Sequence, residues 1–317
     1  MLLMSFTAEV RDELSRLEQV RECCNKAELS ALLRFDGTVT RAGASQYRLE
    51  VATENAQVAR RIIKLVKLLY QMETELTVRR SVLHKTNNYQ ITIPNQPMLA
   101  SVLEELGLTG SVYLGGGIER SLIKRECCAM AYLRGAFLGS GFIASPKGDF
   151  HFEIRTHTQS LAEELALLMG RFTIEGRVIS RRGSWTVYLK GAEPIINFLA
   201  LVGAHKALLQ TENVRIMKSF RNDVNRRVNA EIANQAKASK AALSQIEDIK
   251  LIESTVGLDS LAPALAEFAR LRINNTDVSL RELGEMSDPP LSKSAVNHRM
   301  RRLADKANRI RFEQNHS

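Results

Sequence analysis

A block of this sequence occurs twice. Arg21-Glu22-Cys23-Cys24 recurs as Arg125-Glu126-Cys127-Cys128, and the residues behind each copy keep matching at the same offset over 21–37 and 125–141. A duplicated unit predicts two similar halves related by a pseudo-twofold axis. Function must then be sought at the positions where the two copies differ.

The apolar patterns of the two halves are also similar. Helical spacing and strict alternation predict the same order in each half: helix, long loop, strand, helix, strands and helix. In the first half the expected helices are 8–17, 22–35, 56–70 and 97–106, and the expected strands are 47–53, 76–83 and 89–93. In the second half the expected strands are 150–156, 176–182 and 185–189, and the expected helices are 161–169 and 194–202.

Length and charge limit the domain organisation and the partners. A chain of 317 residues suits two domains, and a net charge of +9 favours a polyanion such as nucleic acid over a membrane. No apolar run approaches the roughly 20 residues of a spanning helix, and the apolar start is too short for a signal peptide, so we expect a cytoplasmic protein. The expected domains are 1–205, with repeats at about 8–106 and 118–203, a basic linker at 206–223, and a helical domain at 224–317 with its long helix at 224–254.

Two features suggest chemistry that the spacing does not support. Each cysteine pair is vicinal and lacks the two-residue gap that lets both sulfurs of a pair face one ion, so we expect inert thiols buried in helix cores and no metal. The segment 107–117 is rich in glycine but lacks the glycine spacing and the Lys of a phosphate loop. It is interpreted as a flexible joint, and no cofactor or small-molecule substrate is expected.

The segment LSALLRFDG at 29–37 resembles the signature of the LAGLIDADG homing endonucleases, and LRGAFLGSG at 133–141 is its partner. The resemblance implies a pseudo-twofold αββαββα saddle of the α+β class, in which two signature helices pack together between two four-stranded sheets that lie on DNA. Small residues should line the contact between the helices, and they recur once per turn at Ala27, Ala31, Ala131, Gly135 and Gly139. Phe35 is expected opposite Gly139.

Nuclease chemistry in that family needs one carboxylate at the eighth signature position of each half. Asp36 occupies this position in the first half, whereas Ser140 occupies it in the second. We therefore expect poor Mg²⁺ binding and no cleavage, because Asp149 could restore the second acid only from a loop. The alternative is an enzyme, a nicking endonuclease or intron maturase that uses Asp36. The paired arginines expected on the saddle as further DNA contacts are Arg79, Arg80, Arg181 and Arg182.

A second informative segment, 261–310, predicts a helix-turn-helix at about 279–307. Ser279 caps a helix with Glu282 three residues later, as in a capping box, and the prolines that follow Asp288 prevent helix. Ser292 then caps a third helix, whose buried stripe should be Val296, Met300, Leu303 and Ala307.

The opposite face of this third helix carries residue types that read DNA. Ser294, His298 and Arg301 lie opposite the stripe, with Asn297 at the edge. Arg301 suits guanine edges and Asn297 suits adenine edges. The flanking residues Lys293, Arg299 and Arg302 suit phosphates. The expected DNA contacts are Ser292, Lys293, Ser294, Asn297, His298, Arg299, Arg301 and Arg302. His298 has no partner at the spacing of helical metal ligands. RNA is disfavoured because only 6% of residues are aromatic and none is interleaved with the basic patches.

The saddle signatures, the ending LGEMSDPPLSKSAVNHRMRRL and the opening MSFTAEVRDELSRL together resemble the WhiA family of bacterial sporulation and cell-division regulators. The resemblance covers almost the whole chain and implies a non-enzymatic transcription regulator or nucleoid-associated protein that binds double-stranded DNA. Its third-helix segment is similar to the promoter-reading region of sigma factors. The N-terminal body would be a second DNA contact, or a platform for RNA polymerase or a cell-division factor.

Overall fold

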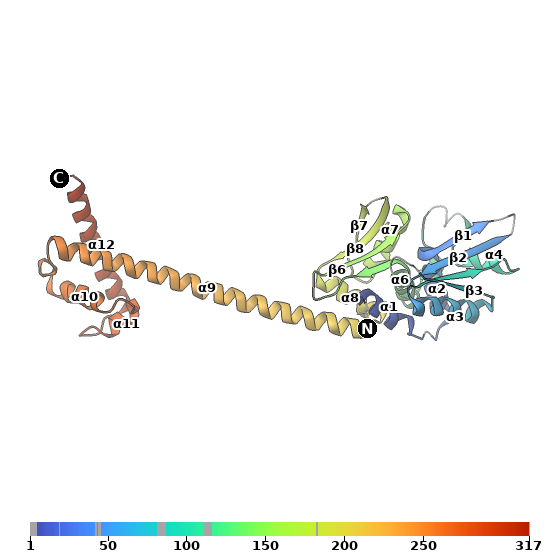
Figure 1. Ribbon diagram of the computed structural model, residues 1–317, viewed down its shortest axis with the longest axis horizontal. Coiled ribbons are helices and arrows are strands. Elements are labelled where there is room, and N and C mark those ends of the chain that lie inside the picture. The colour runs from blue at the N-terminus through green and yellow to red at the C-terminus, as the bar shows by residue number, and fades with distance from the viewer. Residues whose placement is uncertain are drawn as a thin grey trace. The chain divides into compact units, whose positions relative to one another are not determined.

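The chain forms two units when it is divided by its internal contacts, Met1–Lys218 and Ser219–Ser317. The computed structural model describes residues 5–18, 20–41, 43, 46–80, 87–110, 116–181 and 183–316 (Figure 1). The division falls within one helix, α9 (His205–Thr255). This helix begins well before the predicted 224, so the expected linker 206–223 is helical. The predicted domain limits at 205 and 224 both lie in α9 and stay predictions.

The first unit contains the two repeats, which have the same order of elements. The first repeat consists of α1 (Phe6–Ser15), α2 (Glu22–Asp36), β1 (Gly37–Arg41), β2 (Tyr47–Thr53), α3 (Ala56–Tyr70), β3 (Glu75–Arg80), β4 (Asn87–Ile93) and α4 (Leu99–Glu105). The second consists of the 3-10 helix η1 (Arg120–Ile123), α6 (Glu126–Ser140), β5 (Gly141–Ile143), β6 (His151–Thr156), α7 (Gln159–Gly170), β7 (Arg177–Arg181), β8 (Ser184–Lys190) and α8 (Ala192–Val202). The α+β class and the duplicated saddle are confirmed.

Each repeat has a four-stranded antiparallel sheet. The strand orders β1-β2-β4-β3 and β5-β6-β8-β7 are equivalent, and the two sheets lie on either side of α2 and α6 (Figure 1). The long loop expected after each signature is wrong, because β1 and β5 begin there directly. Gly37 permits this close joint, since a Cβ at that position would lie 2.2 Å from the Leu33 carbonyl oxygen. The end of the expected strand 76–83 lies outside the described residues.

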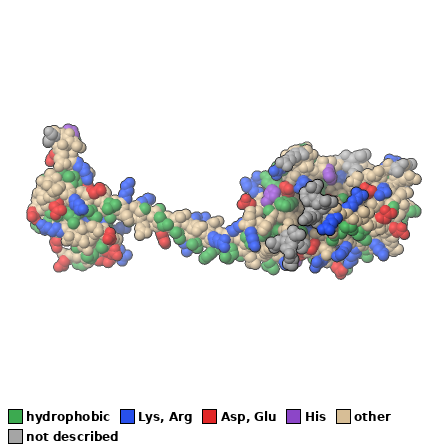
Figure 2. Space-filling view, viewed as in Figure 1, with side chains coloured by type: hydrophobic (Ala, Val, Ile, Leu, Met, Phe, Trp, Pro, Cys, Tyr) green, Lys and Arg blue, Asp and Glu red, His purple; other side chains and the backbone are tan. Residues whose placement is uncertain are grey.

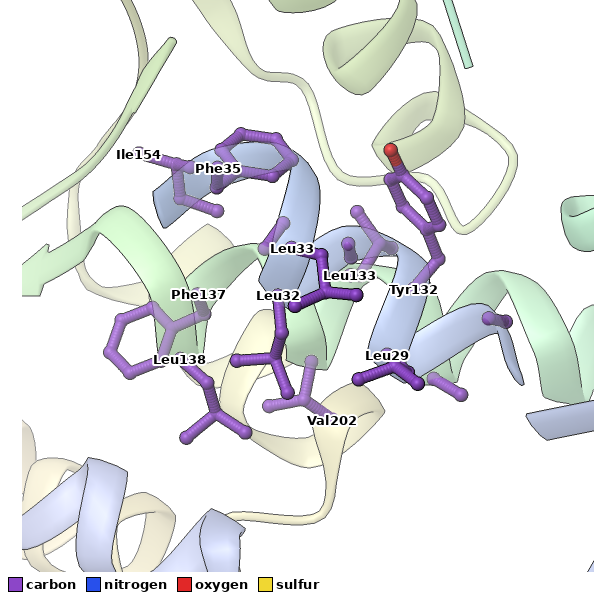
Figure 3. Packing of buried hydrophobic residues seen from close by; sticks show 14 of the residues in the cluster. Leu29, Leu32, Leu33, Phe35, Tyr132, Leu133, Phe137, Leu138, Ile154 and Val202 are labelled. Carbon is purple, nitrogen blue, oxygen red and sulfur yellow. The ribbon is translucent and has the colours of Figure 1, made fainter. Parts of the chain in front are cut away.

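Helices α2 and α6 pack with their backbones in close approach, as the small residues predict. A Cβ on Gly135 would lie 2.4 Å from the Glu28 carbonyl oxygen and 2.8 Å from the Ala31 Cβ. One on Gly139 would lie 3.0 Å from the Phe35 Cβ, which confirms the expected pairing of a large and a small side chain. Around this contact, apolar side chains of both helices form one continuous core (Figure 3).

A buried carboxylate joins three helices beside this contact. Glu28 of α2 is fully buried and accepts from Arg61 Nε of α3 at 2.7 Å and from Arg134 Nε of α6 at 2.9 Å. Arg134 also donates to the Val202 carbonyl at the end of α8. Removal of a single member of such a buried set leaves charge without compensation and costs about 3–5 kcal/mol. The set therefore fixes how the two halves fit together.

The glycine-rich segment between the halves is anchored at both of its ends. Arg34, near the end of α2, donates to the carbonyl of Gly107 at 3.5 Å and to that of Gly117 at 3.2 Å. Residues 111–115 lie outside the described part of the chain. The expected flexible joint is thus held to the central helix at each end.

The second unit is all helical. After the end of α9 it contains η2 (Leu258–Ser260), α10 (Pro263–Asn274), α11 (Leu280–Glu285) and α12 (Lys293–Asn315). Apolar residues of α9, α10 and α12 form a separate core, and Arg311 of α12 pairs with Asp248 of α9 at 2.6 Å. In the described part of the chain, no helix combines the length and apolar character needed to cross a bilayer.

We predict that Gly135→Ala destabilises the first unit by about 1–3 kcal/mol, because its methyl group must push α2 and α6 apart. Gly170→Ala is the matched control, since a Cβ at the end of α7 would meet no atom within 4 Å. Denaturant unfolding followed by fluorescence of the single tryptophan, Trp185 in β8, measures both variants. Equal free energies of unfolding for the two variants would contradict the close packing.

Candidate nucleic-acid interface

The two acid positions of the signatures meet at one cavity. Asp36 and Ser140 are the last residues of α2 and α6, and both line a cavity of about 740 Å³. Glu54, Arg155 and His157 line it too, whereas Asp149 does not. The eighth positions of the two signatures therefore lie at one cavity, and only the first of them supplies a carboxylate.

A cation from α1 lies at this cavity. Arg11 Nη2 donates to the carbonyls of Gly139 at 3.0 Å and Gly141 at 2.9 Å, which are at the end of α6. Burial lowers the pKa of Arg11, and the charges of Asp36 and Glu54 oppose this shift. Even so, a guanidinium keeps its proton near neutral pH. A fixed positive charge thus lies at the cavity that Asp36 and Ser140 line.

The surroundings of the two signature residues bear on whether they could hold a divalent ion. Burial raises the pKa of Asp36 to about 7, although the charge of Arg11 partly opposes the shift. A substantial fraction of the carboxyl is then neutral at physiological pH. The Ser140 hydroxyl donates to the Arg155 carbonyl at 2.6 Å and so holds the helix end to β6.

The residues around Asp36 were not predicted from sequence. Arg11 belongs to a helix whose buried residues include Phe6, Val10 and Leu14, and nothing in its spacing marks it as part of a site. His157 lies 3.3 Å from the Phe35 carbonyl through Nε2, from a position beyond β6. Only the fold brings these segments to one place.

The cysteines lie at the opposite ends of the same two helices. The four sulfurs of Cys23, Cys24, Cys127 and Cys128 all lie within 4.8 Å of one another. The expectation of thiols buried in helix cores is wrong for half of them, because Cys23 and Cys127 are partly exposed. Burial raises the pKa of Cys24 and that of Cys128, the latter to about 12, whereas contacts with Cys128 and Cys24 lower the pKa of Cys23 and Cys127. The spacing within one pair gave no sign that the two pairs meet.

The predicted saddle arginines lie on the edge strands of the two sheets. Arg79 and Arg80 end β3 and Arg181 ends β7, all exposed, while Arg182 lies outside the described residues. Arg79 pairs with Asn88 and Arg181 with Ser184. Strand alternation places Arg79 on the sheet face away from the core, and Arg80 on the other face.

The second unit contains the expected helix-turn-helix. Ser279 and Glu282 form the predicted capping box of α11, and the Ser292 hydroxyl accepts from the Ala295 amide at the start of α12. Gly284 lets α11 pack closely against the turn and α12, since a Cβ there would lie 2.7 Å from the Leu291 carbonyl oxygen and 3.0 Å from Val296 Cγ2. The predicted stripe of α12 is buried in full and comprises Val296, Met300, Leu303 and Ala307.

Most of the predicted reading residues of α12 are exposed: Ser294, His298 and Arg301 opposite the buried stripe, and Lys293, Asn297 and Arg302 beside that face. Asn297 Nδ2 donates to the Lys293 carbonyl at 3.0 Å, within the helix itself. Among the residues that the structure describes, Arg301 and Arg302 form no ion pair. Lys and Arg side chains are visible over the surfaces of both units (Figure 2).

Arg299 differs from its neighbours, because the fold uses its charge. Its Nη1 donates to the Ala264 carbonyl at 3.2 Å, and its guanidinium lies 5.8 Å from the centre of the Phe268 ring. Both partners belong to α10. The side chain is half-buried, so it fastens α12 to α10, which the sequence pattern alone did not distinguish from phosphate binding.

Comparison with known families agrees with this geometry. The model of the WhiA N-terminal LAGLIDADG-like domain matches residues 22–109, and that of the WhiA LAGLIDADG-like domain matches 129–221. The model of the WhiA C-terminal HTH domain matches 224–307. Together these matches include both signature helices and the helix-turn-helix.

Similar proteins cover nearly the whole chain. Two such proteins are named "Probable cell division protein WhiA". The one from Desulforudis audaxviator is 45% identical over 309 residues, which cover 97% of this chain and 98% of that protein. The one from Brevibacillus brevis is 43% identical over 316 residues, which cover 98% of this chain and 99% of that protein. The crystal structure of full-length DUF199/WhiA from Thermatoga maritima has a TM-score of 0.59 at 23% identity, covers 96% of this chain and 99% of that one, and supports the fold. The chain belongs to the WhiA family.

Proposed function

We propose that the protein is a non-enzymatic regulator that binds double-stranded DNA through α12, as a transcription factor or nucleoid-associated protein. The observation that carries the proposal is the face of α12, where Asn297, His298, Arg301 and Arg302 are exposed opposite a fully buried stripe. A helix held in this way by a helix-turn-helix suits the major groove, with its first turns against base edges. The match to an HTH family model supports the assignment.

The residues of α12 then have distinct tasks. Arg301 and Asn297 contact base edges, because their side chains can form paired hydrogen bonds with guanine and adenine. Lys293 and Arg302 contact phosphates and contribute affinity that is independent of sequence. Arg299 orients the helix, since its charge is already bonded to α10.

The saddle supplies a second, weaker surface for DNA or a protein partner. Its outward sheet faces carry Arg79 and Arg181. A second DNA contact in the same chain as α12 raises the apparent affinity for DNA, because the linked contact acts at a high effective concentration. The same surface would serve as a platform for RNA polymerase or a cell-division factor. The relatives are named "Probable cell division protein WhiA", which supports a role in cell division. The proposal extends to chromosome segregation or sporulation, and to a protein that acts in the cytoplasm at the nucleoid.

Loss of nuclease chemistry follows from the cavity at the helix ends. A hard divalent ion needs several anionic or neutral oxygens. Here Ser140 has replaced one carboxylate, the pKa of Asp36 is near neutrality, and Arg11 places a positive charge beside both. These three features support a non-enzymatic role against the alternative of a nicking endonuclease or maturase.

We predict that Arg301→Ala and Asn297→Ala each weaken specific duplex binding by about 1–3 kcal/mol and relax preference at one base pair. Arg302→Ala should weaken binding to all sequences and reduce the slope of log affinity against log salt by about 1. Titration by fluorescence anisotropy at several salt concentrations measures both effects. Folded RNA should compete poorly with duplex DNA.

The matched control for these variants is Arg270→Ala. Arg270 is an exposed arginine of α10 that pairs with Asp259, so it lies outside the proposed reading helix α12. Its removal should leave DNA affinity unchanged. If Arg301→Ala and Asn297→Ala bind every sequence as well as this control does, α12 is not the reader.

We predict that the purified protein leaves supercoiled plasmid intact in the presence of Mg²⁺ or Mn²⁺. The physical reasons are the missing carboxylate at the second signature position, where Ser140 stands, and the guanidinium of Arg11 at the cavity. Gel electrophoresis of plasmid topology provides the measurement. Nicking by the wild type that disappears in Asp36→Ala would establish the enzyme instead.

The raised pKa of Asp36 predicts a pH-dependent stability. Between the unfolded value of about 4 and the folded value of about 7, only the folded state keeps the proton, so the free energy of unfolding falls as pH rises through this window. The full shift in the pKa of Asp36 corresponds to roughly 4 kcal/mol of free energy of unfolding. Because the carboxyl also contacts the open cavity, we expect the free energy of unfolding to fall by about 1–3 kcal/mol. The other charged groups that line the cavity are Arg11, Glu54, Arg155 and His157.

Asp36→Asn should remove this fall, as measured by Trp185 fluorescence at about pH 5 and about pH 8. Asp149→Asn, which changes a carboxylate outside the cavity, should keep it. An equal pH dependence in Asp36→Asn and the wild type would show that the carboxyl is not held neutral by burial.

A further inference from the structure

The four cysteines form a cluster that the proposed DNA binding does not use. Cys23 and Cys24 begin α2, Cys127 and Cys128 begin α6, and all four sulfurs lie within 4.8 Å of one another. Asp36 and Ser140 are at the other ends of these helices, so the cluster is separate from the cavity described above. The pseudo-twofold packing of the helices brings the two vicinal pairs together.

The separations suit a single soft ion. Zinc bound by thiolate has a Zn–S distance of about 2.3 Å, so neighbouring sulfurs of a tetrahedral site are about 3.8 Å apart. Cys127 Sγ and Cys128 Sγ are already 4.0 Å apart, and the widest pair needs to close by roughly 1 Å to reach this geometry. Four sulfurs around one point suit tetrahedral Zn²⁺ better than Mg²⁺ or Ca²⁺, which prefer oxygen. An iron–sulfur cluster, which is larger than one ion, would require the sulfurs to spread apart.

The surroundings of the cluster balance the charge of such a site. Four thiolates and one Zn²⁺ leave two negative charges. Arg21 Nη1 lies 3.6 Å from Cys127 Sγ, and Arg125 Nη1 lies 3.9 Å from Cys23 Sγ, so each helix supplies an arginine to a sulfur of the other. The amino ends of α2 and α6 add further positive potential. Two cations and two helix ends therefore face the site from both halves.

We infer that Cys23, Cys24, Cys127 and Cys128 bind one Zn²⁺ as a tetrahedral tetrathiolate site that joins the two halves of the saddle. Each vicinal pair contributes two ligands, and neither half can complete the site alone. Arg21 and Arg125 are positioning residues that bond to the sulfurs from outside. A disulfide would draw two sulfurs together and leave the others aside, whereas the mutual proximity of all four suits one central ion.

The test uses the full-length chain, reduced and freed of metal. Zn²⁺ is titrated in competition with a chromophoric chelator, and native mass spectrometry counts the bound ions. We expect one Zn²⁺ per chain, and Co²⁺ in its place should give the intense visible bands of a tetrahedral thiolate complex. Circular dichroism of the metal-free chain monitors its fold throughout.

Variants at the partly exposed sulfurs separate ligands from their surroundings. Cys23→Ser and Cys127→Ser should each abolish the tetrathiolate spectrum of Co²⁺ with the helix content retained. Arg21→Gln and Arg125→Gln should keep the spectrum and weaken affinity by about 10-fold, as is usual for groups that support a ligand. Asp36→Asn, at the far end of α2, should change neither quantity and serves as the control.

Several results would overturn the inference. The first is a folded, reduced chain that binds no Zn²⁺ in a one-to-one ratio, or that gives an octahedral Co²⁺ spectrum. The second is binding that survives in the Cys23→Ser/Cys127→Ser double variant. The third is rapid formation of disulfides without affinity for Zn²⁺, which would identify a redox pair. Preferential retention of iron over zinc would also contradict it.

Discussion

The close contact between α2 and α6 determines the arrangement of the whole first unit. Gly135 allows the two backbones to approach to a distance that no side chain permits, and Glu28 then reaches Arg61 and Arg134 on two other helices. Because these groups are buried, any other spacing would leave charges unpaired. The helix ends are thereby fixed, with four cysteines at one end and the cavity of Asp36 at the other.

The two signature helices end at one cavity, but their last residues differ in chemistry. Asp36 and Ser140 still meet at the ends of the two helices, yet the Ser140 hydroxyl bonds to β6, and Arg11 is fastened to the end of α6. The guanidinium of Arg11 therefore lies at the same cavity as the single signature carboxylate, and its charge interacts with that of Asp36. The two halves therefore share one backbone fold but differ in the side chains at this cavity.

Local patterns predicted most of the fold. Periodicity located the signature helices, the small residues between them and the buried stripe of α12, because these depend on neighbours within one element. It missed β1 and β5, since each joins a helix at a glycine without a turn. It also missed the long-range contacts, namely Arg11 at the cavity, Arg299 on α10 and the meeting of the two cysteine pairs. Such contacts are set by tertiary packing, which no spacing along the chain encodes.

A genome-wide map of where the protein lies on its own chromosome tests the central claim, that α12 reads DNA on a body that does not cut it. If α12 reads DNA, the wild type should give discrete peaks, Arg301→Ala should lose them, and Asp36→Asn should keep them. A profile that Arg301→Ala leaves unchanged would show that α12 is not the reader.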